Sequence, residues 1–331
     1  MSAAIAVFGA GSWGTALADL LARRGHRVRL WAFEAEVAAA IAERHENPSY
    51  LLGHQLSLQL EATTSMGAAA AGAEAFLIAT PSHVTRDVLG QLGGHLPANP
   101  LIIGATKGIE TESLALMSTV AAETLPPHRY VALSGPSFAV EVAGQQPTAV
   151  VAASVDQTAA ERAQELLATG YFRVYTNGDV VGTELAGSLK NVIAIAAGIL
   201  EGLGLGNNPR AALVTRGLAE MTRLGLAMGA DARTFSGLAG MGDLILTTCG
   251  SLSRNRALGV ALAQGVPLAQ YRREHRSVAE GANTSLAAVR LGVTHHVDLP
   301  IASQVADILF AEKPAREAIG ELMDRTPKPE H

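Results

Sequence analysis

Residues 5–14 read IAVFGAGSWG, a short apolar run that leads directly into the pattern G-x-G-x-x-G. Residues 15–21 continue with a helical pattern, so the glycines lie between a predicted strand and a predicted helix. In that setting Gly9 permits the tight turn, Gly11 lets a pyrophosphate approach the backbone, and Gly14 lets the helix lie close to the strand. The stretch therefore predicts a dinucleotide cradle at a helix N-terminus, against the alternative of a glycine-rich turn without function.

An acidic residue follows the second predicted strand. That strand covers residues 28–31, and Glu34 comes just after it, about 20 positions beyond the glycine motif. A carboxylate at this place accepts hydrogen bonds from the adenosine ribose and repels a 2′-phosphate, and Phe33 offers no cation to offset the repulsion. We therefore expect NAD(H) or NADP(H) as the cofactor, with NAD(H) slightly favoured unless Arg29 or Arg44 reaches the 2′-phosphate.

The composition agrees with a globular enzyme. The chain has 331 residues, enough for two domains, and a net charge of -5. No basic stripe is available to displace counterions from phosphates, so we expect no nucleic-acid partner. Cys249 is the only cysteine, which excludes an intrachain disulfide and a multi-cysteine metal site. The histidines show no metal-ligand spacing, so we expect no bound metal.

The sequence predicts no membrane span and no export signal. The most apolar later run, residues 192–200, is shorter than the ~20 residues that a bilayer needs, and Lys190 and Glu201 flank it. The N-terminus is apolar but lacks a basic leader, and its glycines belong to the nucleotide motif. A single cysteine suits a reducing compartment. These features predict a cytoplasmic protein.

Strands and helices are predicted to alternate through the first half of the chain. The expected strands are residues 5–8, 28–31, 75–79, 101–105, 130–134, 149–153 and 172–175. Such alternation predicts an α/β fold with a mostly parallel, doubly wound sheet. After the turn dipeptide at 177–178 the strand-like runs stop, and helical segments continue to about Leu322. We therefore divide the chain into a nucleotide-binding domain, an all-helical domain and a tail, which are residues 1–177, 178–325 and 326–331.

Two loops that follow predicted strands carry polar residues. Lys107 lies in ATKG, residues 105–108, and SGPSFA, residues 134–139, follows the next strand along the chain. Doubly wound sheets hold their ligands at the carboxyl ends of the strands, so both loops are candidates for a site. The alternatives are a solvated loop lysine for Lys107 and a structural turn for residues 134–139, which fits that segment equally well.

Lys190 lies in an otherwise apolar helix, ELAGSLKNV, residues 184–192. A lysine among such neighbours either reaches the surface with its end or is held in a pocket. Burial, or a second cation such as Lys107 nearby, would lower its pKa and make the neutral amine available as a base. Oxidation of an alcohol by a nicotinamide needs such a base, because the hydroxyl proton must leave as the hydride departs. Lys190 is therefore the candidate catalytic residue.

A possible anion site precedes the helical stretch 257–263. Residues 251–256 read SLSRNR, and serine and asparagine are good N-caps, so a simple helix start is one interpretation. Arginine suits the positive end of a helix only if an anion also binds there, and that combination makes a phosphate site. Asp243 is either a helix cap or a partner for a substrate hydroxyl. Cys249 has no histidine partner in the sequence pattern and is not expected to be a nucleophile.

Together these segments closely resemble one family, the bacterial NAD(P)-dependent glycerol-3-phosphate dehydrogenases. The match runs in order through nearly the whole chain. Its motifs are GAGSWGTALA (9–18), ATKGIE (105–110), SGPSFAVEV (134–142), ELAGSLKNVIAIAAGI (184–199), AALVTRGLAEM (211–221), GLAGMGDLILTTC (237–249), SRNR (253–256) and VAEGANT (278–284). So many ordered motifs make the resemblance specific.

The resemblance implies a Rossmann domain, a helical domain like the C-terminal domain of 6-phosphogluconate dehydrogenase, and a homodimer. It implies reversible reduction of dihydroxyacetone phosphate to sn-glycerol 3-phosphate for phospholipid biosynthesis, with Lys190 as proton acceptor. It places the substrate against Lys107, Gly135, Ser137, Lys190, Asp243, Ser253, Arg254 and Asn255. It places the cofactor against Ser12, Trp13, Lys107, Ala139, Arg254, Val278 and Glu280, beside Gly9, Gly11, Gly14 and Glu34, which the glycine motif and its spacing predict.

The chain departs from the family pattern at two places. Residues 50–52 read YLL where the family usually has Tyr-Leu-Pro, which is expected to alter only a loop. Residues 32–34 lack the arginine or histidine that many members carry after the second strand, which argues against strong use of NADP(H). Two alternatives remain open: a dehydrogenase of the 6-phosphogluconate and 3-hydroxyacid group, and a non-catalytic nucleotide-binding sensor. The joint presence of Lys107, Lys190 and residues 253–255 disfavours the sensor.

Overall fold

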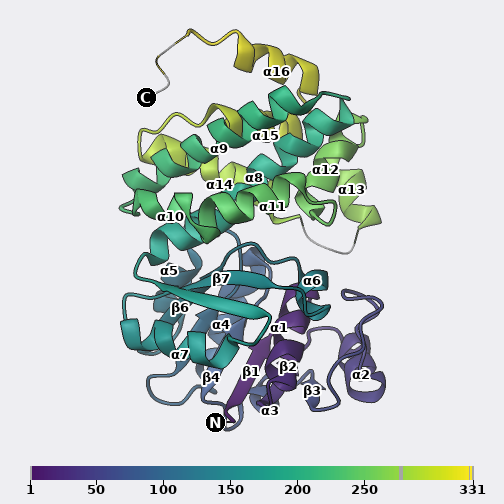
Figure 1. The fold of residues 1–331 in the computed structure, drawn as a ribbon, viewed down its shortest axis with the longest axis vertical. Coiled ribbons are helices and arrows are strands. Elements are labelled where there is room, and N and C mark those ends of the chain that lie inside the picture. Colours follow the sequence, from purple (N-terminus) through teal and green to yellow (C-terminus); the bar gives the residue numbers. More distant parts are fainter. Residues whose placement is uncertain (1, 276–278, 328, 330–331) are drawn as a thin grey trace.

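The computed structural model describes residues 2–275, 279–327 and 329. The half that contains the N-terminus is a sheet with helices on both faces, and the other half is helical (Figure 1). Within the described residues, the sheet has the strand order β3-β2-β1-β4-β5-β6-β7-β8. All neighbouring strands are parallel except β6 and β7, which are antiparallel. The strands are β1 (Ala4–Phe8), β2 (Arg27–Trp31), β3 (Leu60–Thr63), β4 (Ala75–Ile78), β5 (Leu101–Gly104), β6 (Arg129–Ser134), β7 (Thr148–Ala153) and β8 (Phe172–Asn177).

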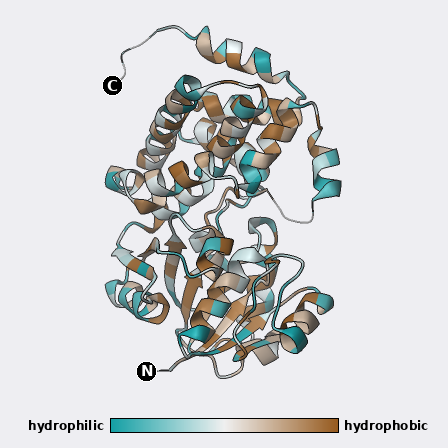
Figure 2. Cartoon of the chain, turned by 45° about the vertical axis from the view of Figure 1, so that its right-hand side comes forward, coloured by the Kyte–Doolittle hydropathy of each residue, from teal (hydrophilic) through white to brown (hydrophobic). Residues whose placement is uncertain are grey.

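Both faces of the sheet are buried, as a parallel sheet requires. The helices of this half are α1 (Ser12–Arg23), α2 (Ala35–Arg44), α3 (Met66–Ala70), α4 (Ser82–Gly93), α5 (Met117–Thr124), α6 (Ala139–Ala143) and α7 (Gln157–Leu167). Alternate residues of β1 point to opposite faces: Ile5 and Val7 pack with α1 and α7, whereas Ala6 and Phe8 pack with α4 and α5. The apolar strands in the lower half of Figure 2 lie between these two layers.

Helix α8 is the core of the other half. The helices there are α8 (Val180–Gly202), α9 (Asn207–Ala227), α10 (Ala232–Ser236), the π-helical turn η1 (Leu238–Gly242), α11 (Asp243–Cys249), α12 (Arg254–Ala263), α13 (Leu268–Glu274), α14 (Glu280–Thr294), α15 (Pro300–Phe310) and α16 (Ala315–Met323). Among the described residues, α8 alone is long and apolar enough to cross a membrane, but 89% of its apolar window is buried in the protein. It is therefore a core helix, packed against α9, α11, α12 and α14.

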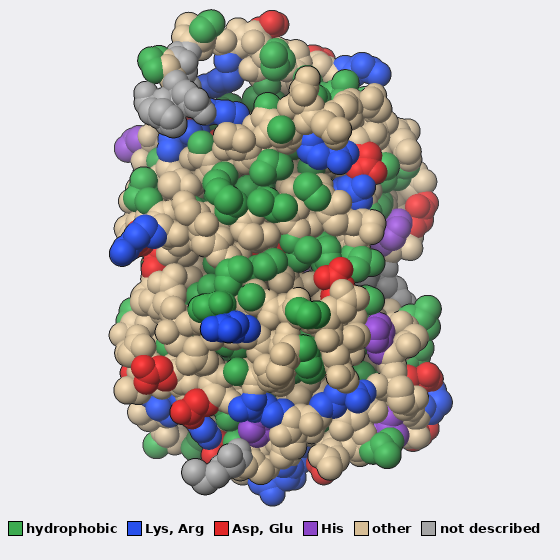
Figure 3. Space-filling view, viewed as in Figure 1, with side chains coloured by type: hydrophobic (Ala, Val, Ile, Leu, Met, Phe, Trp, Pro, Cys, Tyr) green, Lys and Arg blue, Asp and Glu red, His purple; other side chains and the backbone are tan. Residues whose placement is uncertain are grey.

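The face drawn in Figure 3 carries hydrophobic side chains over the helical half and near the level where the halves meet. In the helical half, Leu226 of α9, Met241 of η1 and Ile245 of α11 are exposed. Lysine, arginine, aspartate and glutamate side chains are scattered over the same face without forming one charged stripe. The side chains of α11 are thus divided, with Ile245 outside and Asp243 inside the protein.

The predicted fold class is confirmed, and all seven predicted strands are present. The eighth strand, β3, was not predicted. Its sequence LEAT is short and polar, and only Leu60 is buried, because β3 lies at one edge of the sheet. The predicted domain boundary falls between the end of β8 at Asn177 and the start of α8 at Val180, and the division itself stays a prediction. Part of the predicted tail, residues 328, 330 and 331, lies outside the described residues.

Candidate active site

The glycine turn between β1 and α1 has the shape that a dinucleotide cradle needs. Gly9 has a φ of 109°, in the region that favours glycine. A Cβ on Gly14 would lie 1.9 Å from the carbonyl oxygen of Gly9, so the helix can approach the strand only with glycine there. A Cβ on Gly11 would meet nothing within 4 Å, and Gly11 caps α1 without a side-chain bond. The helix N-terminus is therefore open to a pyrophosphate.

A loop after α2 packs over this turn and connects it to Glu34. Ser12 Oγ donates to the Tyr50 carbonyl oxygen at 2.5 Å, and the Tyr50 hydroxyl donates to Glu34 Oε1 at 2.5 Å. Asn47 donates from Nδ2 to the Ala10 carbonyl oxygen at 2.9 Å. The Glu34 carboxylate is thus held on the side of the glycine turn, where the sequence predicts the ribose. Asn47 and Tyr50 escaped the sequence analysis because an ordinary loop would carry the same residues.

Two further predicted cofactor contacts lie beside the turn. Trp13 and Ala139, the first residue of α6, pack against the same apolar cluster. The Trp13 Nε1 atom is buried and has no hydrogen-bond partner within the described residues. A buried indole N–H without an acceptor is unusual and suits a site that receives a polar ligand. Val278, also predicted to contact the cofactor, lies outside the described residues.

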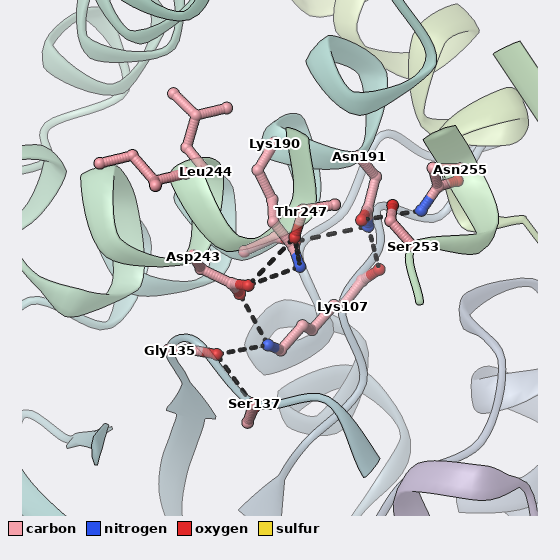
Figure 4. A network of polar contacts seen from close by, with 12 residues as sticks. Lys107, Gly135, Ser137, Lys190, Asn191, Asp243, Leu244, Thr247, Ser253 and Asn255 are labelled. Carbon is pink, nitrogen blue, oxygen red and sulfur yellow. Dashed lines mark hydrogen bonds and ion pairs between the residues drawn. The ribbon is translucent and has the colours of Figure 1, made fainter. Parts of the chain in front are cut away.

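The predicted lysines meet at one buried carboxylate, that of Asp243 (Figure 4). Lys107 Nζ lies 2.7 Å from Asp243 Oδ2, and Lys190 Nζ lies 2.7 Å from Asp243 Oδ1. Lys107 comes from the loop after β5, Lys190 from α8 and Asp243 from the start of α11, so both halves of the protein contribute. We call these three residues the Lys–Asp–Lys cluster. Asp243 is 1% exposed and Lys190 is 7% exposed, so both charges are removed from water.

Neighbouring groups fix the cluster. Lys107 Nζ also donates to the Gly135 carbonyl oxygen at 2.9 Å, and Ser137 Oγ donates to the same oxygen at 3.0 Å. Lys190 Nζ donates to Thr247 Oγ1 at 2.7 Å. Thr247 lies one helical turn after Asp243, a spacing that puts both side chains on one face of α11. That spacing was the signal in the sequence that could have identified Thr247.

The charges of the cluster follow from its burial. Burial lowers the pKa of Lys190 to about 8, helped by the neighbouring charges of Lys107 and Arg254 and opposed by Asp243. Burial alone would raise the pKa of Asp243, but the two lysines hold it below its ordinary value. The site therefore contains a stable carboxylate and an amine that changes protonation near neutral pH. Such an amine can give a proton to, or take one from, an oxygen atom bound beside it.

The predicted phosphate residues at the start of α12 divide into two groups. Arg254 is exposed, and its guanidinium makes no hydrogen bond within the described residues. Ser253 is the N-cap of α12 and accepts from the Arg256 N–H at 3.2 Å. Asn255 is buried and donates to Asn191 Oδ1 at 2.9 Å while its own Oδ1 accepts from the Gly281 N–H at 2.9 Å. Arg254 is thus free to bind an anion, whereas the side chains on either side of it already hold the helix.

Two contacts were absent from the sequence analysis. Asn191 joins α8 to α12 and also lies 3.4 Å from the Lys107 carbonyl oxygen through its Nδ2. Glu280, predicted to contact the cofactor, accepts from the Ser82 N–H at 3.0 Å and from Ser82 Oγ at 2.5 Å. That contact connects α14 to the start of α4, so Glu280 holds the halves together. Its role toward the cofactor stays a prediction.

Comparison with known proteins agrees with this site. Residues 4–160 match the N-terminus of NAD-dependent glycerol-3-phosphate dehydrogenase, and residues 179–320 match its C-terminus. A glycerol-3-phosphate dehydrogenase (NAD(P)+) from Geobacter metallireducens is 54% identical over 333 residues, covering 100% of this chain and 99% of that protein. The solved glycerol-3-phosphate dehydrogenase from Coxiella burnetii is 39% identical with a TM-score of 0.95, covering 98% of this chain and 99% of that chain. The Saccharomyces cerevisiae enzyme is 27% identical with a TM-score of 0.81, covering 98% and 100%.

Proposed function

Because this chain belongs to the NAD-dependent glycerol-3-phosphate dehydrogenase family, we propose that it interconverts dihydroxyacetone phosphate and sn-glycerol 3-phosphate with a nicotinamide dinucleotide cofactor. The observation that carries the proposal is the Lys–Asp–Lys cluster. It places a titratable amine, a second cation and a carboxylate in a buried site, built from the loop after β5 and from two helices of the other half. A ketone and a secondary alcohol differ by a hydride and a proton, and this site supports transfer of the proton.

Lys190 is the proton donor and acceptor in this proposal. The bound nicotinamide supplies the hydride in one direction and takes it in the other. In the reduction, the Lys190 ammonium group protonates the oxygen that was the ketone. In the oxidation, the neutral amine takes the hydroxyl proton. A pKa of about 8 lets Lys190 serve both directions near neutral pH. Lys107 supplies positive charge beside the same oxygen, and Asp243 holds both amines in place.

Arg254 and Glu34 carry the specificity in this proposal. Arg254 binds the substrate phosphate, since its guanidinium is exposed and lacks a protein partner within the described residues. Glu34 accepts from the adenosine ribose, and its carboxylate, oriented by Tyr50, disfavours a 2′-phosphate. NAD(H) is then used at least as well as NADP(H). We also propose that the protein is a homodimer in the cytoplasm and that its product serves phospholipid synthesis. Sedimentation would test the dimer, and the lipid content of a deletion strain would test the role in phospholipid synthesis.

The test is a spectrophotometric assay of NADH and NADPH oxidation with dihydroxyacetone phosphate. The wild-type protein should turn over with both, and Lys190→Ala should lose ~100-fold or more in kcat while still binding NADH. Lys313→Ala is the matched control, since Lys313 pairs with Glu321 and Asp307 in the C-terminal helices. Near-normal turnover of a folded Lys190→Ala protein would remove Lys190 from the mechanism. No turnover of wild type with any phosphorylated ketone would refute the proposed function.

A further inference from the structure

Glu184 is a buried carboxylate that none of the proposed proton-transfer or binding steps uses. It lies on α8 and is 7% exposed, and no lysine, arginine or histidine within the described residues forms an ion pair with it. Its partners are three hydrogen-bond donors. Oε1 accepts from the Ser118 N–H at 2.9 Å and from the Tyr130 hydroxyl at 2.8 Å, and Oε2 accepts from Ser118 Oγ at 2.5 Å. We call Glu184, Ser118 and Tyr130 the Glu184 clasp.

The clasp joins the two halves of the protein. Ser118 lies in the first turn of α5 and Tyr130 lies on β6, both in the sheet half, whereas Glu184 belongs to the core helix of the other half. A carboxylate at the N-terminus of α5 meets the positive end of the helix dipole, and it satisfies a backbone N–H that has no partner within the helix. The contact therefore fixes the start of α8 against the sheet.

The position of α8 bears directly on Lys190. Lys190 lies six positions after Glu184, which is about 9 Å along an α-helix. If the start of α8 shifts at Glu184, Lys190 shifts with it, because the backbone hydrogen bonds of the helix keep this segment stiff. Lys107, the other lysine of the cluster, donates to the carbonyl oxygen of Gly135, the residue that follows β6. Tyr130 of the clasp lies near the start of β6. The clasp thus links the helix that carries Lys190 to the strand that positions Lys107.

A small cavity confirms that the clasp and the cluster adjoin. Its lining includes Glu184 and Lys107, together with Gly187, Ser134 and Thr183. The hydroxyl groups of Ser134 and Thr183 are buried and have no hydrogen-bond partner within the described residues. The region between the clasp and the cluster is therefore polar and contains hydroxyl groups without hydrogen-bond partners. A small shift of α8 meets less steric resistance there than in the close-packed apolar core.

We propose that Glu184 is a positioning residue for this reaction: its carboxyl group holds α8 against the sheet half, so that the Lys190 amine meets Asp243 and Lys107. The inference rests on the proposed function for its kinetic readout. Glu184 does not touch the substrate, the cofactor or Lys190. It acts through the placement of α8.

Protonation should loosen the clasp. Burial raises the pKa of Glu184 to about 7, although the bonds from Ser118 and Tyr130 lower it. All three contacts donate toward the carboxylate, so a protonated carboxyl must turn its own O–H toward a hydroxyl, which then stops donating. Tyr130 is the titratable side chain in contact with Glu184, and Lys107 lies across the shared cavity. The contact with that hydroxyl then runs in the opposite direction between two neutral groups, so the clasp keeps three contacts but loses its charge-assisted bonds as pH falls through about 7.

The experiment compares Glu184→Gln with Glu184→Ala in the full-length enzyme, well below each unfolding temperature. The glutamine oxygen can accept from the Ser118 N–H and from Tyr130 while its NH₂ group donates to Ser118 Oγ. Glu184→Gln therefore has the hydrogen-bond pattern of the protonated carboxyl at every pH. It should lack the step in kcat near pH 7 that wild type shows, and its kcat at pH 8 should lie below that of wild type by the size of that step, within about threefold. Glu184→Ala should lose about tenfold or more in kcat with an unchanged Kd for NADH, since ~1 Å of misplacement can cost ~100-fold.

Glu220→Ala is the matched control. Glu220 is 4% exposed and accepts from the Ile301 N–H at 2.8 Å and the Ala302 N–H at 3.3 Å, so it caps α15 within the helical half. It should lower stability without lowering kcat. Any of three results would overturn the inference. Glu184→Ala could keep the wild-type kcat, the two alanine variants could lose kcat equally, or Glu184→Gln could keep the pH step of wild type. If Glu184→Ala does not fold, the pH step in Glu184→Gln decides.

An inactive wild-type protein would overturn the proposed function, and hydrogen exchange would then decide the clasp separately. Glu184→Gln should leave exchange in residues 184–190 and 105–108 unchanged at pH 8, whereas Glu184→Ala should speed it in both segments. Faster exchange limited to the α8 segment, or no change in either segment, would overturn the inference.

Discussion

Asp243→Asn should move the pH dependence of both reaction directions to lower pH. The Asp243 carboxylate is 1% exposed and lies 2.7 Å from Lys190 Nζ, so it favours the ammonium form. The other influences on Lys190, which are burial, Lys107 and Arg254, all lower its pKa and remain in the variant. An opposite charge at this distance shifts a pKa by about one to three units. The midpoint of the pH–rate profile should therefore fall by about that amount from its wild-type position near 8.

The sign differs between the directions. Reduction of dihydroxyacetone phosphate needs the ammonium form, so its rate is high at low pH and falls as pH rises through about 8. Oxidation of sn-glycerol 3-phosphate needs the neutral amine, so its rate rises over the same range. In Asp243→Asn the reduction should already decline below neutrality. At pH 7 it should lie about twofold to about 100-fold below its own low-pH plateau.

The measurement is single-turnover kinetics in both directions across the pH range, with the midpoint rather than the amplitude as the result. The midpoint is needed because Asp243 also holds Lys107 at 2.7 Å, so its loss changes the amplitude for other reasons. Thr247→Val is the control: it removes a neutral partner of Lys190 and no charge, and should shift the midpoint less. An unchanged or raised midpoint in Asp243→Asn, or no wild-type midpoint near 8, would refute the electrostatic reasoning.

Three further outcomes are expected. Arg254→Ala should lower kcat/KM for dihydroxyacetone phosphate by about 10–100-fold but leave unphosphorylated dihydroxyacetone nearly unaffected; an unchanged ratio would place the phosphate elsewhere. Glu34→Arg should shift the ratio of kcat/KM values toward NADPH by removing a repulsion and adding an anion partner. If wild type prefers NADPH and the substitution leaves that preference unchanged, Glu34 is not the residue that recognises the ribose. Burial raises the pKa of Glu220 to about 7 in the folded state, so wild-type stability should fall as pH rises from 4.5 to 7. In Glu220→Gln, the free energy of unfolding from denaturant titrations should decrease less steeply with pH, by about 1.4 kcal/mol per pH unit in that window. The same dependence on pH as in wild type would show that Glu220 is not the titrating group.

The sequence predicted the fold where local pattern and burial agree. The strands of the sheet interior are apolar and fully buried, so composition alone identified them, as with AVF in β1 and FLI in β4. The edge strand β3 has one buried residue and was missed, since edge pairing requires little apolar surface. The antiparallel step between β6 and β7 was not predicted either. The connection, residues 135–147, contains α6 and is long enough for either direction of β7, and no residue pattern in either strand encodes the reversal.

Predictions about the site were most complete for residues that carry distinctive chemistry. Lys107, Lys190 and Asp243 stood out because charges in apolar or glycine-rich segments are unusual, and the structure brings the three together. Thr247 and Asn191 did not stand out, because threonine and asparagine are common in helices. Their importance arises only from the packing of α8 against α11 and α12, which links residues more than 50 positions apart.

The two halves meet through carboxylates that cap helices across the boundary. Ser82 donates its N–H and its O–H to Glu280, and Ser118 donates both groups in the same way to Glu184. Each serine lies in the first turn of a helix of the sheet half, and each carboxylate belongs to a helix of the other half. The attraction between a carboxylate and a helix N-terminus falls off within a single turn. Both caps therefore form only in the arrangement of the halves that also brings Asp243 to Lys107, so the caps and the buried cluster stabilise the same geometry.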